Sequence, residues 1–170
     1  YLLDKQTLKE FIGSSTTWIP TLAPLGNILK YKPKAIINQL DTVNKIYQLQ
    51  IENLKFALEN NIEVGLGSDA GAYMVEHPNG IIDEINLMKE AGISNKTIKE
   101  LMIKQTFLFT AIVCDMWMIT TGDEFGFYKR CNVVNGNEKD FEKISFDLSE
   151  YIKDMAIYIK QNPILTNCGK

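Results

Sequence analysis

Glu63-Val64-Gly65-Leu66-Gly67-Ser68-Asp69-Ala70-Gly71 is the stretch of sequence that decides the expected fold. Its apolar first half predicts a short strand over Glu63–Gly67, which leads into an aspartate and then into glycine. In α/β proteins the loops that follow parallel strands build the active site, so Asp69 is the first candidate catalytic residue. The alternative is that Asp69 only forms a turn, because Ser-Asp and Ala-Gly are ordinary turn sequences.

The sequence before this stretch predicts a strand–helix–strand unit. β-branched residues favour a strand over Thr16–Leu22. From Pro33 to Asn60 apolar side chains recur every three or four residues, which is the pattern of an amphipathic helix. Because such units are parallel and right-handed almost without exception, the expected fold class is α/β.

Helical periodicity and capping residues predict further helices around Thr7–Ile12, from Ile81 to Glu90, from near Lys96, and from Ser149 to Gln161. Asp4 is suited to cap the first of these helices, and Ser94 the one that begins near Lys96. Gly92 is expected to end the helix that precedes Ser94. The C-terminal part of the chain is therefore expected to be mainly helical.

Composition limits the classes of function. The chain has 170 residues, 45% of them hydrophobic, which is enough for one substantial core or two very small ones. A net charge of −3 argues against a nucleic-acid partner. No apolar run reaches the roughly 18 residues of a membrane span and no signal peptide is visible, so a soluble, cytoplasmic protein is expected. Cys114, Cys131 and Cys168 lack Cys-x-x-Cys spacing and are expected to be ordinary reduced thiols.

Several motifs together resemble a known family. Gly67-Ser68-Asp69-Ala70-Gly71 is followed by a loop with His77 and then by Glu84–Ser94, while Trp18–Pro24 contains Pro-Thr-Leu. This order is similar to the last strand and following helices of the metal-dependent amidohydrolase superfamily, particularly its imidazolonepropionase-like and dipeptidase-like branch. The resemblance covers about residues 1 to 105. It divides the chain into an amidohydrolase-like partial barrel at 1–105 and a mainly helical C-terminal region of uncertain affiliation at 106–170.

The resemblance implies a partial TIM-barrel-like segment, made of the last two strands and their helices. It also implies the C-terminal part of an enzyme that hydrolyses the C–N bond of a small amide or cyclic amide. Asp69 would be the metal-site carboxylate that transfers the proton, with a divalent metal, zinc being the expected one. His77 would contact the substrate, although a plain loop histidine is an equal alternative.

The family's other metal ligands, a His-x-His and further His or Lys residues, have no counterpart in this sequence. One aspartate and one histidine cannot complete a catalytic zinc shell of three protein ligands. The first residues, Tyr1–Leu8, resemble the middle of a domain, which suggests a fragment. The expected partners are therefore a missing N-terminal half of the barrel, another chain, or further copies in a homo-oligomer.

Two alternatives to a hydrolase stay open, so whether this chain is an enzyme by itself is undecided. The first is a non-catalytic amidohydrolase remnant that acts as a structural or protein-interaction module around the long helices from Pro33 and Ser94. The second is a different enzyme in which Gly122–Gly126 forms a carbohydrate-site loop. Asp123 and Glu124 in that loop are neighbours in sequence, so they do not by themselves make an acid/base pair.

Overall fold

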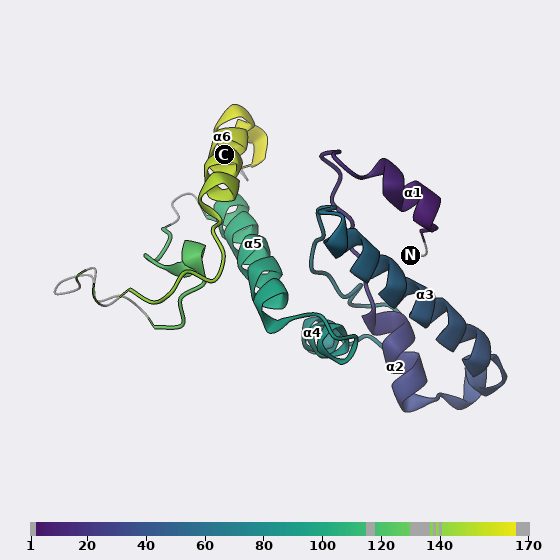
Figure 1. The fold of residues 1–170 in the computed structure, drawn as a ribbon. Coiled ribbons are helices and arrows are strands. Elements are labelled where there is room, and N and C mark those ends of the chain that lie inside the picture. Colours follow the sequence, from purple (N-terminus) through teal and green to yellow (C-terminus); the bar gives the residue numbers. More distant parts are fainter. Residues whose placement is uncertain (1–2, 115–117, 130–136, 138, 140, 166–170) are drawn as a thin grey trace. The chain divides into compact units, whose positions relative to one another are not determined.

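The computed structural model describes residues 3–114, 118–129, 137, 139 and 141–165, and the statements below concern these residues. The chain divides into two compact units, Tyr1–Ile98 (unit 1) and Lys99–Lys170 (unit 2), and each is described by itself. Helices are the dominant elements in both units (Figure 1). None of the described helices is long and apolar enough to cross a lipid bilayer.

Unit 1 contains the helices α1 (Lys5–Glu10), α2 (Ala23–Tyr31), α3 (Leu40–Glu59) and α4 (Gly80–Glu90), with the 3-10 helix η1 (Lys34–Gln39) leading into α3. α2 packs against both α3 and α4, and α1 packs against α3. The core between them is formed by buried side chains that include Leu8, Trp18, Leu22, Leu54 and Met88. These helices carry the loops that hold the candidate site.

The helix predicted from Pro33 to Asn60 is confirmed over most of its length. Tyr47, Ile51, Leu54 and Ala57 are buried at the helical spacing that the sequence pattern indicated. The first turns differ, because η1 is a 3-10 helix in which Ile36 has non-helical backbone angles, φ −127° and ψ 18°. α3 is thus the long amphipathic helix that was expected, beginning later than predicted.

The predicted α/β class is wrong, because the described residues are mainly helical and form no strand. The two predicted strands, Thr16–Leu22 and Glu63–Gly67, share one parallel bridge, between Trp18 and Val64. The Trp18 N–H donates to the Glu63 carbonyl and the Gly65 N–H donates to the Trp18 carbonyl, both at 2.9 Å. The predicted partial TIM-barrel-like segment is wrong for the same reason. The described residues of unit 1 form helices and one isolated parallel bridge.

The pairing stops after one residue pair because of the neighbouring residues. In a parallel ladder every second residue of a strand donates its N–H, so the next donor after Trp18 would be Pro20, which has none. Thr21 then has φ 51°, which turns the chain away towards α2. On the other side of Trp18 the next donor of a ladder would be the Thr16 N–H, which donates instead to the Ser14 hydroxyl at 3.2 Å. The chain therefore leaves the bridge on both sides of Trp18.

The capping residues predicted in unit 1 are confirmed, although the first helix spans Lys5–Glu10 and not Thr7–Ile12. The Thr7 N–H donates to the Asp4 carboxylate at 2.8 Å, and the Thr97 N–H donates to the Ser94 hydroxyl at 3.1 Å. Gly92 follows the end of α4 with φ 85°, a backbone conformation that favours glycine. These ends depend on residues close in sequence, which is why the sequence was enough to locate them.

Unit 2 contains most of α5 (Asn95–Val113), the 3-10 helices η2 (Asp123–Phe125) and η4 (Pro163–Leu165), and α6 (Ser149–Gln161). Its core consists of the buried residues Phe107, Ala111, Phe146, Leu148, Met155 and Ile159. Cys114 is an exposed free thiol, while Cys131 and Cys168 lie outside the described residues. Unit 2 thus has a hydrophobic core of its own.

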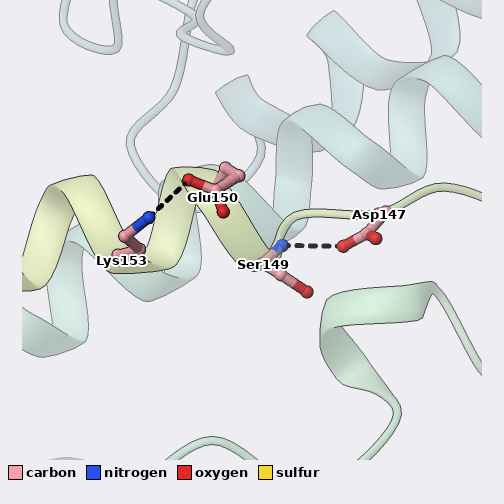
Figure 2. Close-up of polar contacts among 4 residues, drawn as sticks. All are labelled: Asp147, Ser149, Glu150 and Lys153. Carbon is pink, nitrogen blue, oxygen red and sulfur yellow. Dashed lines mark hydrogen bonds and ion pairs between the residues drawn. The ribbon is translucent and has the colours of Figure 1, made fainter.

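The bounds of α6 agree with those predicted from the sequence, Ser149 to Gln161. Figure 2 shows its first turn, where the Ser149 N–H donates to the Asp147 carboxylate at 2.9 Å. One turn further, the Lys153 ammonium lies 3.0 Å from the Glu150 carboxylate. Hydrogen bonds from Ser149 lower the pKa of Asp147, so this carboxylate stays ionised while it satisfies the start of the helix.

Candidate functional site

Asp69 begins a compact turn at the end of the extended segment that follows Val64. Its backbone has φ 53°, and its carbonyl accepts a hydrogen bond from the Ala72 N–H at 2.9 Å. Further hydrogen bonds, from the Gly71 N–H to the Val75 carbonyl at 3.0 Å and from the Val75 N–H to the Ala72 carbonyl at 2.9 Å, close the turn. The half-buried side chain of Asp69 is therefore held on a well-defined turn.

The structure brings His77 back to this turn. The side chain of His77 is exposed, and its Nε2 lies 3.4 Å from the position that a Cβ on Gly71 would occupy. Gly71 has φ 102°, a backbone conformation that favours glycine, and the imidazole ring lies at ordinary contact distance from that Cβ position. Asp69 and His77, the two site residues predicted from the sequence, thus flank one glycine turn.

The loop that carries both residues is anchored at its two ends. Ser68, directly before Asp69, is buried. Gly80, the first residue of α4, packs so closely on it that a Cβ at position 80 would lie 2.8 Å from the Ser68 hydroxyl and 2.8 Å from a methyl group of Val75. A loop fixed in this way can hold a side chain in a defined geometry, which binding and catalysis both require.

The described residues do not supply a complete metal site. No group of three or more His, Cys, Asp or Glu side chains that could hold a metal ion occurs in the described part of the chain. A catalytic zinc needs three protein ligands and an open position for water. Asp69 and His77 fit two of the ligand types, so a complete centre would need further ligands from outside these residues.

Glu84, on the inner face of α4, is a functional candidate that the sequence analysis did not single out. Its side chain is 0% exposed, and its two oxygens accept hydrogen bonds from the N–H groups of Leu22, at 2.9 Å, and Ala23, at 2.7 Å. The carboxylate therefore caps the N-terminus of α2 from a distant helix. One signal was available, since Glu84 occupies the same helix face as the buried residues Leu87 and Met88.

Two buried amides complete a polar cluster around the start of α2. Gln50, on α3, donates from its amide nitrogen to the carbonyls of Pro20 and Thr21. Asn27, on α2, donates to the Met74 carbonyl at 2.8 Å. Among the described residues, three buried oxygens of this cluster have no hydrogen-bond partner: Thr21 Oγ1, Asn27 Oδ1 and Gln50 Oε1. Unpaired buried polar atoms are costly, which makes this region one that calls for a binding or structural explanation.

Burial raises the pKa of Glu84 to about 7, and the hydrogen bonds from Leu22 and Ala23 offset only part of this shift. The folded state thus binds the proton more tightly than the unfolded chain, whose glutamates have an ordinary pKa of 4.5. The contribution of Glu84 to the stability of the folded state is therefore fully present below pH 4.5 and is lost as the pH rises to about 7.

We expect the free energy of unfolding of unit 1 to fall by on the order of 3 kcal/mol between pH 5 and pH 8 because Glu84 ionises. Urea unfolding of the wild-type chain and of Glu84→Gln at both pH values isolates this contribution, since the amide does not titrate. The expectation fails if the two proteins show the same dependence on pH.

The Gly122–Gly126 loop, weighed above as a carbohydrate site, forms η2. Glu124 accepts a hydrogen bond from the Gly122 N–H at 2.9 Å, so its carboxylate contacts the start of its own turn. A Cβ at Gly126 would lie 2.7 Å from the ring of Phe146, so this end of the loop packs on the core of unit 2. These contacts give the loop a local packing role.

The chain was compared with known families, curated proteins and solved structures. No family model matches it. No curated protein and no solved structure matches it significantly. The proposals below therefore depend on the residues and geometry of this chain.

Proposed function

We propose that this chain contributes Asp69 and His77 to a metal-dependent site that hydrolyses the C–N bond of a small amide or cyclic amide. The remaining metal ligands would come from another chain or from further sequence of a longer protein. The observation that carries the proposal is the turn after Val64, where Asp69 and His77 flank Gly71. The motif resemblance of residues 1 to 105 supplies the reaction class.

In this proposal a bound divalent metal supplies an activated water. Asp69 would accept a proton from that water as the oxygen of the water attacks the carbonyl carbon, and would return the proton to the nitrogen as the C–N bond breaks. His77, exposed beside the turn, donates a hydrogen bond to the substrate. A rigid turn favours this chemistry because a misplaced general base loses much of its effect.

Zinc binding by the purified chain tests the proposal. We expect zinc to bind, and Asp69→Asn to weaken zinc binding by at least about ten-fold, because an amide is a poor ligand for this metal. Asp41→Asn is the matched control, since Asp41 is an exposed carboxylate in the first turn of α3 and should leave the affinity unchanged. Elemental analysis and calorimetry give the zinc content and affinity, and light scattering gives the number of chains that share each metal.

A chain that stays free of zinc both as a monomer and as an oligomer would contradict the form of the proposal in which further copies of this chain supply the remaining ligands. Zinc binding that survives Asp69→Asn unchanged would also contradict it. Either result would favour the other interpretation of the motif, a non-catalytic module that acts through protein interactions. The two functions are thus separated by one set of titrations.

A further inference from the structure

A pocket of about 490 Å³ lies in unit 1 and has not been used so far. It is lined by Tyr31 at the end of α2, by Met74, Glu76 and Asn79 of the loop before α4, and by Ile82 and Asp83 of α4. This volume is within the range of roughly 300 to 1,000 Å³ that is usual for small-molecule sites. Neither Asp69 nor His77 is among its lining residues, so the pocket does not include the two residues of the proposed hydrolytic site.

The charged groups of the pocket are both negative. Glu76 and Asp83 are its two charged lining residues, and neither forms an ion pair with another described residue. Glu76 accepts one hydrogen bond, from the Asn79 amide at 3.3 Å. Two carboxylates that face the same hollow without a cation favour a positively charged ligand.

Asn27 forms a buried support behind this wall. Its side chain is 1% exposed, and its amide nitrogen donates to the Met74 carbonyl, at 2.8 Å, and to Asp83 Oδ2, at 3.0 Å, so Asn27 holds two of the lining residues in place. Its amide oxygen has no partner among the described residues. The lining therefore presents two carboxylates as acceptors to a ligand with N–H donors, and one of them, Asp83, is held by Asn27.

The rest of the lining suits a cation with a short apolar body. The ring of Tyr31 already faces one ammonium group, since the Nζ of Lys30 lies 5.2 Å from the ring centroid. Ile82 is exposed and Met74 half-buried, so both offer apolar surface beside the carboxylates. Lys30 would compete with a bound cation for this ring.

We propose that this pocket binds a small organic cation, a primary ammonium group on a short apolar chain. The ammonium group would donate hydrogen bonds to Asp83 and Glu76, the two carboxylates of the lining. The apolar chain would lie on Met74 and Ile82. This binding does not depend on the hydrolytic function, because it uses neither Asp69 nor His77.

Titration of the full chain with n-pentylammonium, followed by NMR of the Asn27 side-chain amide, tests the proposal. We expect a saturable shift for this probe. 1-Pentanol, which has the same chain but no charge, should give none, and tetramethylammonium, which has no N–H donor, should bind at least about five-fold more weakly. Equal binding of pentanol, or no saturable shift with the amine, would overturn the proposal.

Substitutions of single residues show how much each side chain contributes to the affinity for pentylammonium. We expect Asp83→Asn to weaken pentylammonium binding about ten-fold and the exposed Glu76→Gln about two- to five-fold. Lys30→Met should tighten it about two-fold, because it removes the competing ammonium. Asp41→Asn, outside the pocket, should change nothing. If Asp83→Asn does not fold, the other two variants decide, and unchanged affinity in Glu76→Gln and Lys30→Met would overturn the proposal.

Discussion

Glu84→Ala is expected to lower the free energy of unfolding of unit 1 by about 4 kcal/mol at pH 5. The substitution leaves the buried N–H groups of Leu22 and Ala23 without their acceptor, and each unpaired donor costs about 1 to 3 kcal/mol. It also opens a cavity between α4 and the start of α2. Urea unfolding, followed by the fluorescence of buried Trp18, measures the loss.

The expected loss is smaller at pH 8, about 1 to 2 kcal/mol, because the wild-type protein then already bears the cost of a buried charge. Glu90→Ala is the matched control, since Glu90 lies on the same helix but is exposed, and it should change stability by less than about 0.5 kcal/mol. A Glu84→Ala protein as stable as the Glu90→Ala protein at pH 5 would show that the carboxylate does not cap α2.

Phe146→Ala is expected to destabilise unit 2 by about 3 to 5 kcal/mol. Its ring is 8% exposed and belongs to the core cluster with Phe107, Leu148 and Met155. Replacement by alanine leaves a cavity where the backbone of Gly126 now packs against the ring. Hydrogen exchange should show the effect as lost protection of the backbone amides of α6, while the amides of α3 in unit 1 keep theirs.

Phe141→Ala provides the comparison for this experiment. Phe141 is 50% exposed and contacts Phe127, with the ring centroids 6.0 Å apart. Its removal should cost less than about 1.5 kcal/mol, in line with one exposed aromatic contact. If Phe146→Ala removed protection equally from α3 and α6, the cores of the two units would not be independent.

The sequence predicted best those elements that depend on neighbouring residues. The side chains of Asp4 and Ser94 cap helices where expected, and α6 has the predicted bounds. Each of these depends on a side chain within a turn of the helix end or on a continuous apolar face. Asp69 was selected because it follows a predicted strand, and His77 because of the family resemblance, and the roles of both stay predictions.

The strands could not be predicted correctly because pairing depends on distant partners. Thr16–Leu22 and Glu63–Gly67 have strand-like composition, but Pro20 removes the donor that the second bridge would require. α2 was missed because Pro24 and Gly26 disfavour a helix by composition. Pro24 lies in the first helical turn, where it is tolerated, and a Cβ at Gly26 would lie only 2.5 Å from the side chain of Leu87, so glycine there allows α4 to pack closely.

The polar cluster around Glu84 was beyond sequence reasoning for the same reason. Its carboxylate meets N–H groups that lie more than sixty residues earlier in the chain. The one local signal, the helix face that Glu84 shares with Leu87 and Met88, does not say what the carboxylate would contact. The packing of α4 against α2 decides that the Glu84 side chain is buried at the start of α2.

The single bridge between Trp18 and Val64 also sets an order of events during protein synthesis. Both of its hydrogen bonds join Trp18 to residues that a ribosome would add about 45 residues later, which takes several seconds at about 5 to 20 residues per second. During that interval the indole ring of Trp18 cannot reach its final buried place. The bridge therefore forms only after synthesis has passed Gly65, whereas α1 can form from residues that are already joined when Trp18 is added.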